Sequence, residues 1–204
     1  AKDMESFYKY QKEGYDAFRE GLLHARSDLI ESLPLRKGGN MVWVDIGGGT
    51  ARNLEFFEPA IIKKYFKKIV IVDISSSLLE IARQRIIDMG LEKIVTAIEA
   101  DCTQESGLKG LPVAGTADIV TMSYSFSMIP DQGAAMVNAT KLLKKDGHLA
   151  VADFFLDGKH DEALPRFARF WRKIERAFHK QWFAMDHVHL LGPEQLQLGG
   201  KQLE

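Results

Sequence analysis

The chain has 204 residues, of which 46% are hydrophobic and 27% are charged. This balance is typical of a globular domain and excludes a disordered, collagen-like or coiled-coil protein. The 27 basic and 28 acidic residues leave a formal net charge of −1, without the basic excess that nucleic-acid binding usually requires, so we expect no DNA or RNA partner.

The first elements along the chain are a helical lead-in and a buried strand. Apolar residues recur at helical spacing within residues 5–33, and Pro34 ends this pattern. The run MVWVDI at residues 41–46 is short, apolar and rich in β-branched residues, and glycines follow it at once. This pattern predicts a parallel strand that leads into a tight turn.

After the glycines, helical and strand patterns alternate. Helices are predicted near residues 52–66 with a break at Pro59, over 78–89 with a cap at Ser75, Ser76 or Ser77, and over 131–145. Further strands are predicted over residues 69–73, 94–100, 117–123 and 148–155, the last after a turn at Asp146 and Gly147. This alternation predicts a doubly wound α/β fold with a mostly parallel sheet, covered on both faces and joined by right-handed crossovers.

No repeat, low-complexity tract or shift in composition marks a domain boundary. We therefore predict a single domain over residues 1–204. Within it we expect a lead-in or lid over residues 1–40, a ligand-binding core over 41–160, and a C-terminal helix and tail over 161–204.

The clearest local signal is the glycine turn after the first strand. That strand contains Asp45 and leads into Gly47, Gly48 and Gly49. In open α/β sheets, ligands bind outside the carboxyl ends of the strands, and three glycines in a plain turn would carry an entropy cost, so we favour a ligand loop. A dinucleotide fingerprint would need a glycine at Arg52, and no P-loop pattern is present, which disfavours nicotinamide enzymes and P-loop nucleotide binding.

Polar residues also end the following strands. Asp73, followed by Ile74, ends the second strand, where a carboxylate can accept hydrogen bonds from two adjacent ribose hydroxyls; the alternative is a cap for the helix after it. The third and fourth strands end in two further pairs, Asp101 with Cys102 and Ser123 with Tyr124. Each pair alone fits an ordinary turn, but together they would line one edge of one sheet.

Metal and disulfide chemistry have little support. Cys102 is the single cysteine, so the chain forms no internal disulfide and offers no multi-thiolate metal site. His187 and His189 are an isolated pair, which is more typical of the surface than of a metal site. We expect no metal.

The motifs VDIGGG, IVIVDIS, EADC and ADIVTMSYS resemble, in order and spacing, those of class I S-adenosylmethionine-dependent methyltransferases. A narrower similarity, to the N-methyltransferase domain of betaine lipid synthases, extends from about Met4 to Leu190. It is carried by residues 7–26, 42–53, 118–131 and 151–155. The resemblance implies trimethylation of the amino group of diacylglyceryl-homoserine, with S-adenosylmethionine as the cofactor.

The resemblance also implies roles for individual residues. The methionine portion of the cofactor would lie against Asp45 and the turn Gly47, Gly48 and Gly49, the ribose against Asp73 beside Ile74, and the adenine edge against Asp101 and Cys102, with Ser123 also at the cofactor. Tyr8 and Tyr15 would close over the sulfonium and the acceptor amine.

The sequence departs from the family pattern at three places. Ala51 stands where the family commonly has glycine, and Ser76 stands where it often has proline. Class I methyltransferases usually finish with an antiparallel strand pair, and the chain ends soon after residues 187–197. We therefore expect that pair to be incomplete.

Methyl transfer to an amine needs positioning, exclusion of water and an unprotonated acceptor. Tyr8, Tyr15 and Tyr124 are the candidate catalytic residues, because a tyrosine can hydrogen-bond the amine and its ring attracts cations. The alternative for each is a half-buried packing role. Arg19 and Arg26 are candidates for a homoserine carboxylate, although a solvated surface position is the simpler expectation for either.

Residues 165–182 combine aromatic residues at helical spacing with a basic face. This pattern is typical of helices that bind anionic membrane surfaces, and equally of a crossover helix packed on the sheet. With no membrane-spanning segment or leader pattern in the sequence, we expect a cytoplasmic protein with peripheral membrane contact as a further hypothesis. A fused or partner domain would make the acceptor.

Two alternatives stay open. One is a methyltransferase that acts on another small amine, a phenol or a quinone, because the fold does not determine the acceptor. The other is a non-catalytic, cofactor-binding half of a larger lipid synthase.

Overall fold

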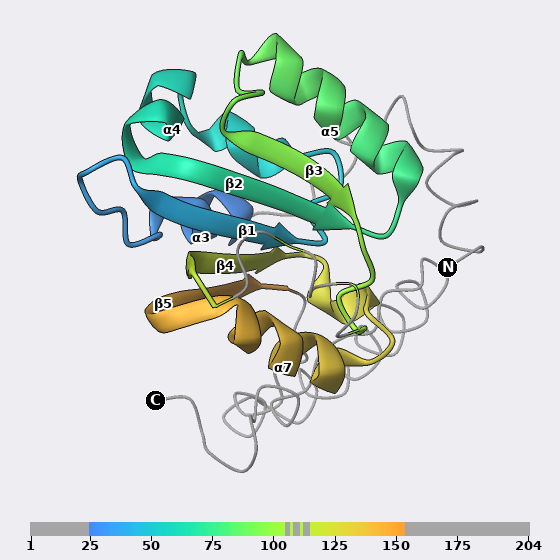
Figure 1. Ribbon diagram of the computed structural model, residues 1–204. Coiled ribbons are helices and arrows are strands. Elements are labelled where there is room, and N and C mark those ends of the chain that lie inside the picture. The colour runs from blue at the N-terminus through green and yellow to red at the C-terminus, as the bar shows by residue number, and fades with distance from the viewer. Residues whose placement is uncertain (1–24, 105–106, 108–110, 112–114, 154–204) are drawn as a thin grey trace, which may run out of the picture.

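The computed structural model describes residues 25–104, 107, 111 and 115–153. Its strands are β1 Met41–Ile46, β2 Phe66–Asp73, β3 Val95–Glu99, β4 Ala117–Ser123 and β5 Leu143–Ala152. They form one five-stranded sheet in the order β3-β2-β1-β4-β5 (Figure 1), and every neighbouring pair is parallel. The predicted doubly wound α/β fold is confirmed.

Helices cover both faces of this sheet. The helical elements are α3 Ala25–Glu31, η1 Arg52–Phe56, α4 Pro59–Tyr65, α5 Ser76–Asp88, η2 Phe126–Met128 and α7 Gln132–Leu142. Side chains of α3, α4 and α5 pack in one buried cluster, and those of α7 pack in another. In the described part of the chain, no helix has the length and apolar character that crossing a bilayer requires.

The two clusters follow from the alternation of side chains along the strands. In β1, Val42 and Val44 point to the α7 side, whereas Met41 and Trp43 point to the side of α3, α4 and α5. Because both faces are covered, all six residues of β1 and all seven of β4 are buried. This double burial explains why both strand sequences are predominantly apolar.

Several local predictions hold at the level of single residues. The strands predicted over 41–46 and 117–123 have those bounds. Pro59 begins α4 after the 3-10 turn η1, as the predicted break requires. Ser75 is the residue that caps α5, since its side chain accepts the N–H of Leu78.

The end of α7 and the start of β5 differ from the prediction. We expected the helix to reach residue 145 and Asp146 with Gly147 to form a turn, but α7 ends at Leu142 and β5 already begins at Leu143. The pairing of β5 with β4 shifts register between the pairs Ala117–Leu143 and Ile119–His148. Asp146 and Gly147 therefore lie in a bulge, where a Cβ on Gly147 would be only 2.7 Å from the Ala117 carbonyl oxygen.

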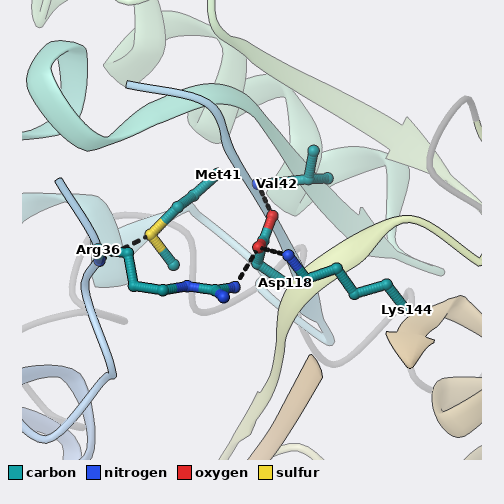
Figure 2. Close-up of polar contacts among 5 residues, drawn as sticks. All are labelled: Arg36, Met41, Val42, Asp118 and Lys144. Atoms are coloured by element: carbon teal, nitrogen blue, oxygen red, sulfur yellow. Dashed lines mark hydrogen bonds and ion pairs between the residues drawn. The ribbon is translucent and has the colours of Figure 1, made fainter. Parts of the chain in front are cut away.

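The amino end of β4 is held by a cluster of polar contacts on Asp118 (Figure 2). Oδ2 of Asp118 accepts the N–H of Val42 at 2.8 Å, and Oδ1 accepts from Arg36 at 2.5 Å and from Lys144. Burial alone would raise the pKa of Asp118, but the hydrogen bonds from Lys144 and Val42 and the charges of Lys144 and Arg36 outweigh it and lower the pKa. One carboxylate thus joins β4 to β1, to the segment before β1 and to β5.

Replacing Asp118 with asparagine is expected to lower the free energy of unfolding at pH 7 by about 1–3 kcal/mol. A carboxyl whose pKa is lowered by folding stabilises the protein above its ordinary value of 3.8 and loses that contribution as the pH falls below it. The difference between wild type and variant should therefore shrink in urea titrations between pH 5 and pH 3. The exposed Asp146, changed to asparagine, is the control; equal losses in the two variants would contradict the prediction.

Candidate functional site at the carboxyl ends of the strands

The glycine turn lies directly after β1, at the centre of the sheet. Gly47 and Gly49 have left-handed φ values of 66° and 51°, which glycine adopts at little cost. The N–H groups of Gly47 and Gly48 both donate to the carbonyl oxygen of Val72, at 2.7 and 3.2 Å, so the turn is bound to the end of β2. Ala51 is also left-handed, with φ 60°, a conformation that accounts for a glycine preference at this position.

The surroundings restrict the three glycine positions to different degrees. A Cβ on Gly47 would lie 2.3 Å from Cβ of Ser125, and one on Gly48 would lie 2.7 Å from Cγ2 of Ile71. A Cβ on Gly49 would make only ordinary contacts, the nearest at 3.6 Å to Leu78. Gly47 and Gly48 are thus crowded by the protein itself on the side where a Cβ would lie, and Gly49 is not. That this turn is a ligand loop stays a prediction.

Asp73 connects this turn to the helix that follows β2. Its side chain is buried, with Oδ2 accepting the N–H of Gly49 at 2.8 Å and Oδ1 accepting the N–H of Ser75 at 2.9 Å. The half-buried Ile74 follows Asp73 in sequence and precedes Ser75. A carboxylate offers about four acceptor positions, so anchoring the turn is compatible with the predicted contact to ribose hydroxyls.

Asp45 is fully buried beneath the turn. Thr121 Oγ1 donates to Oδ1 at 2.6 Å, and Asn53 Nδ2 donates to Oδ2 at 3.0 Å. Burial raises the pKa of Asp45 to about 6, and the negative charge of Asp73 adds to this rise. The hydrogen bonds from Thr121 and Asn53 and the positive charge of Arg26 lower the pKa, but they do not outweigh burial. Thr121 and Asn53 both lie in motifs named above, but sequence reasoning missed their contacts with Asp45, because these contacts depend on how the turn and the strands pack.

The end of β3 places Asp101 and Cys102 differently from each other. Oδ1 of the half-buried Asp101 accepts the N–H and the hydroxyl of Thr103, at 2.9 and 2.7 Å, and so shapes the turn after β3. The Cys102 side chain lies in the hydrophobic core on the α7 side, where burial raises the pKa of its thiol to about 12. The thiol is therefore neutral, and only the backbone of Cys102 suits the predicted adenine edge.

The end of β4 carries two buried hydroxyl groups, those of Ser123 and Ser127, that have no hydrogen-bond partner in the described part of the chain. Between them Tyr124 is buried and has a left-handed φ of 53°, a conformation that concentrates at functional sites. Sequence reasoning missed Asp153, just after β5, whose Oδ2 accepts the N–H of Ser127 at 2.9 Å.

The order β3-β2-β1-β4-β5 brings these strand ends into one row, with the glycine turn at the point where the chain changes direction across the sheet. Asp73, Gly49 and the orphaned hydroxyl of Ser123 fit a ligand with ribose hydroxyls and amino-acid groups, as an S-adenosyl compound has. The predicted Tyr8, Tyr15 and Arg19 lie outside the described residues. Among the described residues, no group of three or more His, Cys, Asp or Glu side chains is placed to hold a metal ion.

Comparison with known families gives one match over most of the chain. A family described as a methyltransferase domain matches residues 15–198. Two curated relatives are ubiquinone/menaquinone biosynthesis C-methyltransferases. The relative from Shewanella piezotolerans is 28% identical, and the match covers 65% of this chain and 49% of the relative. The relative from Allorhizobium ampelinum is 27% identical, and the match covers 69% of this chain and 56% of the relative. The chain thus spans about half the length of the curated relatives it matches.

Solved structures show the same fold. A methyltransferase structure from Bacillus halodurans covers 84% of this chain and 66% of its own, with 21% identity and a TM-score of 0.59. A second structure is the geranyl diphosphate C-methyltransferase of Streptomyces coelicolor A3(2) in complex with S-adenosyl-L-homocysteine. The match covers 84% of this chain and 56% of that enzyme, with 12% identity and a TM-score of 0.63. At these identities the likeness concerns the fold alone.

Proposed function

The chain belongs to the methyltransferase-domain family, and on that premise we propose that it transfers a methyl group from S-adenosylmethionine to an acceptor at the carboxyl ends of its strands. The observation that carries this proposal is the contact of Asp73 with Gly49, which joins the glycine turn after β1 to the acid that ends β2. This pairing lies at the switch point of the sheet, where α/β folds bind their ligands.

When bound, S-adenosylmethionine supplies a methyl group that is already activated by its sulfonium. The protein's task is therefore to bind, orient and exclude water. Asp73 would hold the ribose hydroxyls, the half-buried Gly49 would present its backbone, and the Ser123 hydroxyl would accept or donate a further hydrogen bond. The buried Asp45 would act from beneath the turn as a negative charge.

For the acceptor we propose the amino group of diacylglyceryl-homoserine. The support is the resemblance of residues 118–131 and 151–155 to betaine lipid synthases, together with the position of Tyr124 and Asp153 at the strand ends. An amine must lose its proton before it attacks, and the carboxylate of Asp153 would be the base that accepts this proton. We also propose that residues 165–182 contact the membrane that contains this lipid and that a fused or partner domain makes the acceptor, both from sequence pattern alone.

A second candidate acceptor is the ring carbon of a quinone precursor. Its support is the name of the curated relatives, which are C-methyltransferases of ubiquinone/menaquinone biosynthesis. The two acceptors differ in chemistry, because a carbon acceptor needs an electron-rich ring, whereas the amine needs only its free electron pair.

A methyl-transfer assay with two acceptors separates these functions. The chain is incubated with methyl-labelled S-adenosylmethionine and with vesicles that contain diacylglyceryl-homoserine, a quinone that lacks its ring methyl and is kept in its reduced, electron-rich quinol form, or neither. We expect label only in the homoserine lipid, in products with one to three added methyl groups, and sedimentation of the protein with the vesicles. Label in the quinone would establish the second candidate, and cofactor binding without transfer to either would point to a non-catalytic half of a larger enzyme.

A further inference from the structure

A chain of hydrogen bonds runs from the hydrophobic core to the carboxylate beneath the glycine turn. Nε1 of Trp43 donates to Oγ1 of Thr121 at 2.7 Å, and Oγ1 of Thr121 donates to Oδ1 of Asp45 at 2.6 Å. All three residues are fully buried, at 0% exposure. Their alignment follows from the sheet, since Asp45 pairs with Thr121 across β1 and β4, and Trp43 lies on the same face two residues earlier.

The chemistry of the three groups determines the direction of this chain. An indole N–H can only donate, so the Thr121 oxygen must accept it, and the single hydroxyl proton of Thr121 is left for Asp45. The other carboxylate oxygen, Oδ2, receives Nδ2 of Asn53 at 3.0 Å. Both oxygens of Asp45 therefore face donors, an arrangement that suits an ionised carboxylate and would repel the proton of a neutral one.

In the part of the chain that the structure describes, two charged side chains affect the pKa of Asp45. Arg26 of α3 contributes a positive charge and Asp73 of β2 a negative one. Arg52 and Glu55 of η1 pair with each other. Burial opposes the charged form of Asp45 more strongly than any other influence, and the Thr121 hydrogen bond is the largest influence that favours it.

We propose that Thr121, oriented by Trp43, is a positioning residue that keeps Asp45 ionised and fixed beneath the glycine turn, so that the site favours a positively charged ligand. A Cβ on Gly48 would lie 2.9 Å from Oδ2 of Asp45, which places this charge directly under the turn. A buried charge acts over a longer range than an exposed one, because little water screens it. The inference rests on the proposed function, since S-adenosylmethionine carries a sulfonium charge that its demethylated product, S-adenosylhomocysteine, lacks.

The first test compares these two ligands by calorimetry at pH 6, close to the pKa of Asp45. Thr121→Val keeps the shape of the side chain and removes the hydroxyl. We expect it to weaken S-adenosylmethionine binding by about fivefold or more, and S-adenosylhomocysteine binding by less than about twofold. Thr121→Ser keeps the hydroxyl and should retain the wild-type ratio of the two affinities, even though it loses a buried methyl group. Equal weakening of both ligands in Thr121→Val would overturn the proposal.

The second test needs no ligand. Carbon NMR follows the ionisation of the Asp45 carboxylate with pH, and Thr121→Val should move its midpoint upward by about one pH unit or more, because the charged form loses a donor. Thr121→Ser, and Ile119→Val as a control for lost packing in the same buried face of β4, should leave the midpoint in place. An unmoved midpoint in Thr121→Val would overturn the inference whether or not the ligands bind. Failure of the wild type to bind either ligand, with the midpoint moved, would instead overturn the proposed function and the ligand preference built on it.

Discussion

Replacing Asp73 with alanine is expected to weaken the binding of S-adenosylmethionine by about tenfold or more, which corresponds to about 1.4 kcal/mol. The change removes the carboxylate proposed to hold the ribose hydroxyls. It also leaves the N–H groups of Gly49 and Ser75 without the acceptor that positions the turn and the start of α5. Since hydrogen bonds to a charged group contribute about 1.5–3 kcal/mol each, the loss should be large.

Calorimetric titration of wild type and variant with S-adenosylmethionine and S-adenosylhomocysteine measures this effect. The exposed Asp88 at the far end of α5, changed to alanine, is the matched control and should bind both ligands as the wild type does. Thermal unfolding of each variant shows whether the turn has simply collapsed. Unchanged affinity in a folded Asp73→Ala protein would mean that Asp73 only anchors the turn, and would remove the main support for the proposed site.

Replacing Gly47 with alanine is expected to lower the free energy of unfolding by about 2–4 kcal/mol and to abolish cofactor binding. Gly47 has φ 66°, and an added Cβ would lie 2.3 Å from Cβ of Ser125. Ser125 cannot easily give way, because it is buried and its hydroxyl donates to the carbonyl oxygen of Ile46 at 2.8 Å. The turn would have to move away from β4 to accept even one methyl group.

Two further variants, studied by urea unfolding and calorimetry, separate the backbone strain of a left-handed residue from the steric overlap with Ser125. Gly49→Ala introduces a similarly left-handed residue, φ 51°, but meets only ordinary contacts, so it should cost about 1–2 kcal/mol. The double variant Gly47→Ala with Ser125→Gly removes the overlapping side chain and should regain part of the lost stability. Equal costs for the two single variants, or no regain in the double variant, would show that Ser125 is not the obstacle.

Most of the architecture can be predicted from local sequence signals. The bounds of β1 and β4, the break at Pro59 and the cap at Ser75 follow from short-range chemistry, namely apolar runs, the missing N–H of proline and the preference of serine for helix starts. The glycine turn and the acid at the end of β2 could also be recognised as a candidate site. Each of these signals lies within a few residues along the chain, where spacing alone determines which groups meet.

The contacts of each site residue, in contrast, depend on long-range packing. Asp45 and Thr121 are 76 residues apart in sequence and meet because β1 and β4 are neighbours in register. The same long-range packing places Ser125 against Gly47 and extends β5 back to Leu143 where helical spacing predicted α7 to continue. Local propensity carries no information on strand order or register. The contact of Thr121 with Asp45 and the contact of Ser125 with Gly47 therefore depend on how the strands assemble into the sheet.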